Sequence, residues 1–127
     1  MVKSTLTLTA CAALALASLA AFAADTAKEI GTAAAHAGMA AGAADPQMVR
    51  AHLHHVLNCL EGPGGADFDE TPGNPCKGQG NGAIPDSAAA ARPSLEQALA
   101  LVKEALHEGE INKAKAKAAE AQAILSK

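Results

Sequence analysis

The chain has 127 residues, a formal net charge of −3 at pH 7 and almost no aromatic surface, with two phenylalanines and no tryptophan or tyrosine. Its local cluster of cations, Lys113, Lys115 and Lys117, has no aromatic residues among it, so we exclude a role in binding nucleic acid. After the first 24 residues no stretch is apolar enough to span a bilayer, so we expect no membrane partner once they are removed.

Residues 1–24 have the pattern of a cleaved secretory signal peptide. Lys3 precedes an almost wholly apolar run that ends in small residues just before Asp25. A lipoprotein signal at Cys11 is disfavoured, because most of the apolar run follows that cysteine. We therefore predict a periplasmic or secreted protein with one domain over residues 25–127.

Residues 25–61 are predicted to form a hairpin of two helices. The first spans Asp25 to Ala44 and presents a narrow face of small residues, which favours close packing of a second helix. Its start resembles a capping box, in which Thr26 and Glu29 would satisfy each other's backbone amides. The second helix follows a short turn, so the two helices should run antiparallel.

The stretch from Gln47 to Leu60 has the clearest helical periodicity of the chain. One stripe at core spacing consists of Val49, Leu53, Val56 and Leu60. A second stripe about 90° round the helix consists of Met48, His52, His55 and Cys59. The opposite side, expected to face solvent, carries Arg50, His54 and Asn58.

Residues 62–86 are rich in glycine, proline, asparagine and aspartate and show no period, so we predict a long connecting loop. Removal of the signal peptide leaves two cysteines, Cys59 and Cys76, in an oxidising environment. We expect them to form a disulfide that ties this loop down. On the chain-entropy estimate, such a bridge stabilises the fold by about 3 kcal/mol.

Residues 87–127 are predicted to form a second hairpin. Its first helix should begin at Ser94 in another capping box and end at Gly109, and its second should run from about Glu110 to Leu125. Neither hairpin can bury an apolar face alone. The sequence therefore predicts an all-α protein, a four-helix up-down bundle made of two hairpins.

The histidines of the first hairpin are predicted to converge. His36 lies about nine residues before the turn, and His52 and His55 lie about seven and ten residues after it, which places all three roughly 13 Å from the turn. With Met39 or Met48 as a soft fourth group, three imidazoles favour copper above all, or nickel or zinc. The alternative is that these are ordinary histidines on a helix flank, since His36 lies about 100° from the alanine face.

Other chemistries find less support in the sequence. No nucleophile elbow, phosphate loop or dinucleotide fingerprint is present, so we expect no enzymatic activity. Inward carboxylates are absent from the predicted core stripes, which excludes a di-iron carboxylate site. Non-covalent haem between Met39 or Met48 and a histidine is a lesser alternative, but the chain has too little aromatic surface, so no haem is expected. The main alternative to metal binding is a protein-interaction module that uses the Gly/Pro-rich loop, with another periplasmic protein as its partner.

The helices resemble the helical-hairpin repeat of the small periplasmic metal-binding protein family. The resemblance rests on Ala35-His36-Ala37, Gly42, Ala51-His52, Glu108-Gly109 and the segment from Ala114 to Ala121. It implies a histidine-bearing four-helix bundle that binds copper, nickel and other divalent ions for buffering or scavenging. By position, His36 and His52 match the histidines of the repeat. The loop between Cys59 and Asp86 and the small number of histidines depart from the family pattern.

Overall fold

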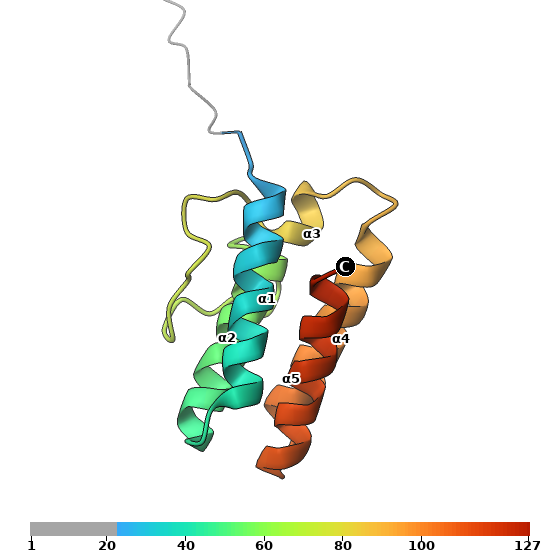
Figure 1. Cartoon of the computed structure of the whole chain (residues 1–127). Coiled ribbons are helices and arrows are strands. Elements are labelled where there is room, and N and C mark those ends of the chain that lie inside the picture. The colour runs from blue at the N-terminus through green and yellow to red at the C-terminus, as the bar shows by residue number, and fades with distance from the viewer. Residues whose placement is uncertain (1–22) are drawn as a thin grey trace, which may run out of the picture.

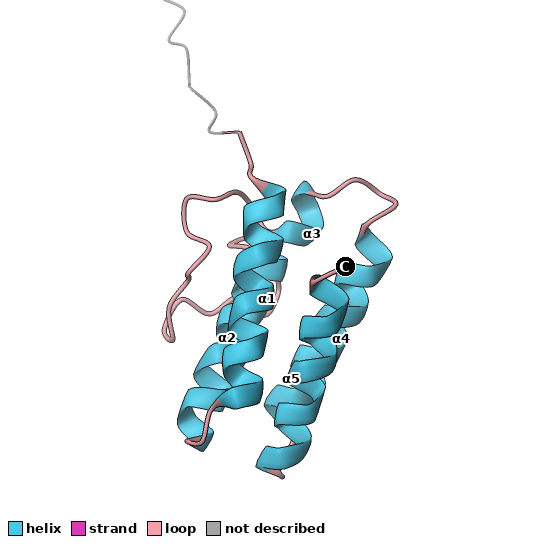
Figure 2. Cartoon of the chain, in the orientation of Figure 1, coloured by secondary structure: helices cyan, strands magenta, loops and turns pink. Residues whose placement is uncertain are grey.

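The computed structural model describes residues 23–127, and within this range the chain forms helices joined by loops and turns, with no strand (Figure 2). Its five helices are α1 (Thr26–Gly42), α2 (Pro46–Glu61), α3 (Ala83–Asp86), α4 (Arg92–His107) and α5 (Ile111–Leu125). All-α structure is therefore confirmed. The signal peptide predicted for residues 1–24, and Cys11 with it, fall almost wholly outside the described residues.

The four long helices lie side by side, while α3 crosses one end of them (Figure 1). Helix α1 packs on α2 and α5, and α4 packs on α5 and α2. Small side chains dominate the faces where α1 and α5 meet the core, namely Ala33, Ala37, Ala40, Ala114, Ala118 and Ala121. Larger apolar residues come mainly from α2, whose Val49, Leu53, Val56 and Leu60 are fully buried as predicted. The alanines let neighbouring helices approach closely, and α2 supplies most of the core volume.

Helix α1 begins with a different cap from the one predicted. The side chain of Asp25 accepts a hydrogen bond of 3.0 Å from the Lys28 amide. Thr26 instead donates its hydroxyl to the carbonyl of Asp86, 60 residues further along the chain. The expected capping box between Thr26 and Glu29 is therefore wrong, because contacts with a distant segment take both side chains.

Helix α4 also begins differently. It starts at Arg92, two residues before the predicted Ser94, and its N-cap Ala91 makes no side-chain capping bond. The Ser94 hydroxyl donates to the Ala91 carbonyl within the first turn. Arg92 donates to the carbonyls of Ser87 and Pro85, which ties the start of α4 to the end of α3.

Glu29 is a fully buried carboxylate on the core side of α1. One of its oxygens accepts a hydrogen bond of 2.9 Å from the Gly82 amide. Burial, together with the nearby carboxylate of Asp86, raises the pKa of Glu29. The prediction that no carboxylate points inward is thus wrong at this position. The capping box predicted at the exposed start of the helix included Glu29, so its burial was not expected.

The segment between α2 and α4 is more ordered than a simple loop. The predicted disulfide between Cys59 and Cys76 is present and joins residues that lie 17 positions apart in the sequence. The end of the predicted loop forms α3. Gly62 (φ +71°) and Gly82 (φ +118°) lie where α2 ends against the start of α3, and a Cβ on either would overlap the backbone of the other segment.

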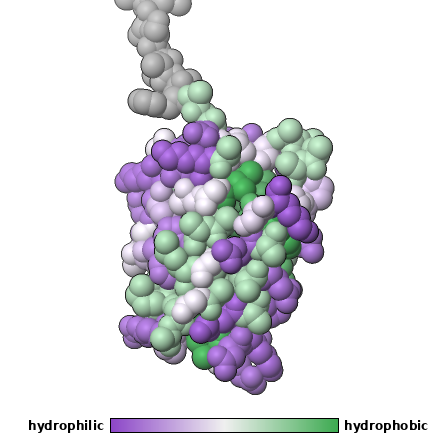
Figure 3. All heavy atoms as spheres, in the orientation of Figure 1, coloured by the Kyte–Doolittle hydropathy of each residue, from purple (hydrophilic) through white to green (hydrophobic). Residues whose placement is uncertain are grey.

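The outer surface is mixed in polarity. On the face shown in Figure 3, strongly hydrophobic residues form only small areas among mildly apolar and hydrophilic ones. Among residues 23–127, the structure contains no helix that is both long enough and apolar enough to cross a bilayer.

Candidate metal centre

The candidate centre lies where α1 and α2 face each other beside the core. His36 comes from α1, and His52 and His55 come from α2, one turn apart. Each imidazole sits next to a fully buried residue, Ala37 in α1 or Leu53 and Val56 in α2, and the rings themselves are half-buried. The helix flank that carries the apolar stripe therefore also holds the three rings at the edge of the core.

The three imidazoles meet through their Nδ1 atoms. His36 Nδ1 lies 3.1 Å from His52 Nδ1 and 3.2 Å from His55 Nδ1. Ligand nitrogens of all three lie within 4.8 Å of one another, and the rings of His36 and His55 meet edge to face. Two nitrogens bound tetrahedrally to one ion at 2.0–2.1 Å are about 3.3 Å apart. The predicted convergence of His36, His52 and His55 is therefore confirmed, and two of the Nδ1 to Nδ1 distances are close to this spacing.

The connecting loop fixes the tautomer of His55. Its Nε2 lies 2.7 Å from the carbonyl oxygen of Pro72, and because a carbonyl only accepts, Nε2 must carry the proton. A neutral His55 then has its lone pair on Nδ1, which faces His36. A backbone carbonyl that orients a ring in this way is the usual outer partner of a metal-bound histidine.

Asn58 holds this part of the loop in place. It is 1 % exposed, so the prediction that it faces solvent is wrong. Its amide nitrogen donates to the carbonyls of Asp69 and Gly73, and its amide oxygen accepts from the Asp69 backbone amide. Gly73, with φ of +109°, packs against His55, since a Cβ there would lie 3.3 Å from Nε2. These bonds set the position of the Pro72 carbonyl between the two anchored residues.

Neutral imidazoles alone do not satisfy the cluster. With the lone pair of His55 on Nδ1, a hydrogen bond to His36 needs the proton on His36 Nδ1. That nitrogen then has no lone pair for His52 and only one proton for two short contacts. At most one of the two contacts is thus a straight hydrogen bond. A metal ion would accept a lone pair from each of the three nitrogens at once.

Burial keeps the rings of His36 and His52 unprotonated. Removal from water, followed by the neighbouring His55 and His52, lowers the pKa of His36 from 6.5 to about 4. Burial, and then His55, also lowers the pKa of His52. Metal binding requires the neutral form of imidazole, so these rings are ready to bind an ion at neutral pH.

The other predicted ligands lie close by in sequence. Met39 and Met48 sit one turn from His36 and His52, and they are 49 % and 47 % exposed. Their role as a fourth ligand stays a prediction. Sequence reasoning missed Asn58, Pro72 and Gly73. The disulfide prediction contained a usable signal, because a bridge at Cys59 returns the loop to α2 one turn after His55.

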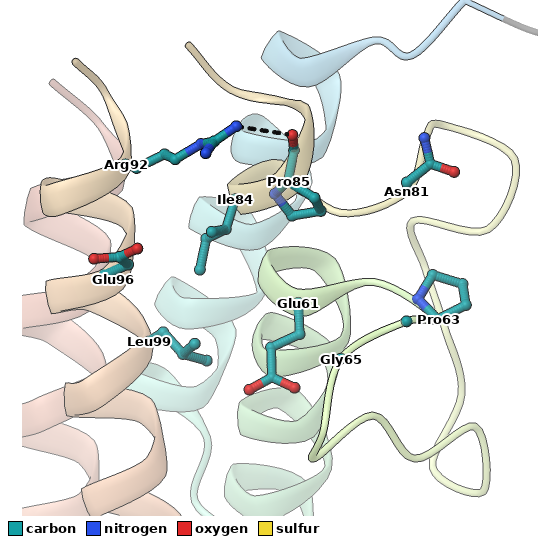
Figure 4. Close-up of a pocket in the computed structure, with 10 residues that line it drawn as sticks. Glu61, Pro63, Gly65, Asn81, Ile84, Pro85, Arg92, Glu96 and Leu99 are labelled. Carbon is teal, nitrogen blue, oxygen red and sulfur yellow. Dashed lines mark hydrogen bonds between the residues drawn. The ribbon is translucent and has the colours of Figure 1, made fainter. Parts of the chain in front are cut away.

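A separate cleft lies at the C-terminal end of α2. It has a volume of about 700 Å³ and is lined by the start of the Gly/Pro-rich loop together with α3 and α4. Ile84 from α3 and Leu99 from α4 point into it, and Glu61, Arg92 and Glu96 supply its charges (Figure 4). The cleft is mainly apolar and is lined by none of the three clustered histidines.

Comparison with models of protein families, with curated proteins and with solved structures finds no match to this chain.

Proposed function

We propose that this protein binds one late transition metal ion through the Nδ1 atoms of His36, His52 and His55. The observation that carries the proposal is the pair of Nδ1 to Nδ1 contacts at 3.1 and 3.2 Å, which neutral imidazoles do not satisfy by themselves. The lowered pKa of His36 and the Pro72 carbonyl behind His55 support it. Copper is the favoured metal, with nickel and zinc as the other candidates.

The wider role we propose is buffering or scavenging of metal outside the cytoplasm, without catalysis. A disulfide is compatible with export, and the pattern of residues 1–24 is that of a signal peptide. We further propose that the four long helices form an up-down bundle of two hairpins, because each contacts the next in a closed ring. We therefore propose a role like that of the small periplasmic metal-binding proteins, which the helices resemble in sequence.

Titration of the mature, metal-free protein with Cu(II), Ni(II) and Zn(II) tests this function. We expect one equivalent to bind, and binding to be lost in a His52→Ala/His55→Ala double variant. His107→Ala is the matched control, because His107 is exposed on α4 and its Nδ1–H donates to the Lys103 carbonyl. Absence of stoichiometric binding to the unaltered protein, or equal loss in the control, would refute the proposal.

A protein-interaction module is the second candidate, and the 700 Å³ cleft beside Pro63 and Gly65 favours it. In that case a photo-crosslinking residue placed at Leu99 should capture one specific partner from a periplasmic extract. The same residue placed at Glu120, which is exposed on α5, should capture none. Identical products from both positions would argue against the cleft as an interface.

A further inference from the structure

Two methionines stand out on the surface of the protein. Met39 and Met48 are the exposed large hydrophobic side chains among residues 23–127, with 49 % and 47 % of their surface in solvent. Burying a methionine contributes to stability, and neither residue belongs to the hydrophobic core. Their exposure therefore has no explanation in packing.

The contact between His36 and His52 sets the register of α1 against α2. Met39 follows His36 by three residues and Met48 precedes His52 by four, and because the helices are joined by the turn at residues 43–45, both steps lead toward that turn. At 1.5 Å per residue, the methionines lie at heights that differ by about 1.5 Å, and about 5 Å beyond the imidazoles.

Both methionines also lie on the same side of the helix pair as the imidazoles. At 100° per residue, Met39 is about 60° from His36 and Met48 is about 40° from His52. In both helices this rotation leads away from the buried residues, such as Ala37 in α1 and Leu53 in α2. The two thioethers therefore flank the solvent side of the three imidazoles.

We infer that Met39 and Met48 form a thioether site for a soft monovalent ion, Cu(I), next to the three-histidine centre. Thioether sulfur prefers Cu(I) to divalent ions, whereas imidazole binds several divalent metals well. The oxidised cysteines offer no thiolate, so these sulfurs are the soft ligands on this flank of the molecule. The ion passes between thioethers and imidazoles by ligand exchange and stays Cu(I) throughout. This inference rests on the proposed function and specifies the oxidation state of the metal.

The test compares soft and borderline ions in the mature protein. Cu(I), held at low free concentration by a competing chelator, and Ag(I), which does not change oxidation state, are the soft probes, and Zn(II) is the borderline probe. A Met39→Leu/Met48→Leu variant keeps the apolar volume and removes both sulfurs. We expect its affinity for Cu(I) and Ag(I) to fall by about tenfold or more, with its affinity for Zn(II) unchanged. Adding a thioether elsewhere, by Ala116→Met on the exposed side of α5, should not restore the loss.

The methyl signals of the methionines provide an independent measurement. On addition of Ag(I), NMR of ¹³C-methyl methionine should show shifts at Met39 and Met48, also in the His52→Ala/His55→Ala variant, which lacks two imidazoles. Equal affinity for soft ions with and without the sulfurs, or unshifted methyl signals, would overturn this inference and leave the three-histidine site intact. Failure of Zn(II), Cu(II) and Ni(II) to bind, with the methyl shifts present, would refute the proposed function and support the thioether site.

Discussion

His55 connects the candidate centre to the rest of the fold through its two nitrogens. Its Nε2–H donates to the Pro72 carbonyl, and its Nδ1 faces His36. The tautomer of a single ring therefore decides whether the cluster presents a lone pair to an ion or a proton to a neighbour. Because the partner of Nε2 is a backbone carbonyl, the position of the loop holds this tautomer.

At the same scale, the low pKa of His36 predicts a pH dependence of stability. The pKa is about 4 in the folded protein and near 6.5 in the unfolded chain, so between these values only the unfolded chain takes up the proton. The His36 contribution to the free energy of unfolding should be largest above pH 6.5 and should fall as the pH drops toward 4. Urea unfolding at pH 7 and pH 4.5 measures this, with His36→Gln as the variant that should lose the His36 part of the dependence. An unchanged pH dependence in that variant would contradict the assignment.

Glu29 predicts the opposite pH dependence. Its pKa is raised above 4.5, so the stability associated with this group is present below pH 4.5 and is lost as the pH rises. In Glu29→Gln the amide oxygen can still accept from the Gly82 amide without carrying a charge. We expect the variant to be more stable than the unaltered protein at pH 7 by about 1 kcal/mol, with a smaller difference at pH 4.5. Chemical denaturation measures this difference. Equal or lower stability of the variant at pH 7 would show that the buried charge of Glu29 does not destabilise the fold.

The loop over residues 62–82, here called the connector, joins the two helix pairs and also contacts the candidate centre. Three hydrogen bonds from one side chain, that of Asn58, link α2 to residues 69–73 of the connector, and the disulfide at Cys59 fixes it again one residue later. Pro72 lies within this anchored stretch, and its carbonyl accepts a hydrogen bond from His55. The connector therefore helps α2 to orient the ring of His55. The connector is thus part of the candidate centre.

Asn58→Ala should therefore affect both stability and metal affinity. Removal of the three bonds leaves buried backbone groups unpaired, at a cost of about 2–3 kcal/mol in the free energy of unfolding. Displacement of the Pro72 carbonyl should weaken metal binding by about 10- to 100-fold. Thermal unfolding and metal titration of the folded variant measure the two effects, with the exposed Asn112→Ala on α5 as control. Normal affinity in a destabilised variant would show that the loop supports the fold and not the site.

Sequence periodicity predicted the long helices and the histidine register, because both depend on a helix period that local residues determine. The helix that carries Val49 and Leu53 also carries His52 and His55, so the core stripe fixed where the imidazoles lie. The burial of Asn58 and Glu29 was not predicted, because loop residues distant in the sequence cover them. The local helical pattern holds no information about such contacts. Apart from the Cys59–Cys76 bridge, contacts between this loop and the helices could not be predicted, for the same reason.

For the molecule as a whole, metal binding should raise thermal stability. An ion that binds only the folded state, at a free concentration of 100 times its Kd, adds about 2.7 kcal/mol. For a domain of this size we expect the melting temperature to rise by roughly 10 °C or more. Calorimetry with and without metal measures the shift, and the His52→Ala/His55→Ala variant should show none. A similar shift in that variant would mean that the ion stabilises the fold elsewhere.

The half-buried position of the three imidazoles has a kinetic consequence. They lie at the rim of the α1–α2 contact, while the core beneath them is closed. A metal ion bound there would leave without any separation of the helices, and its residence time would depend on breaking bonds to imidazole. Such an arrangement suits a reservoir that loads and discharges readily, in contrast to a structural ion that is trapped until the chain unfolds.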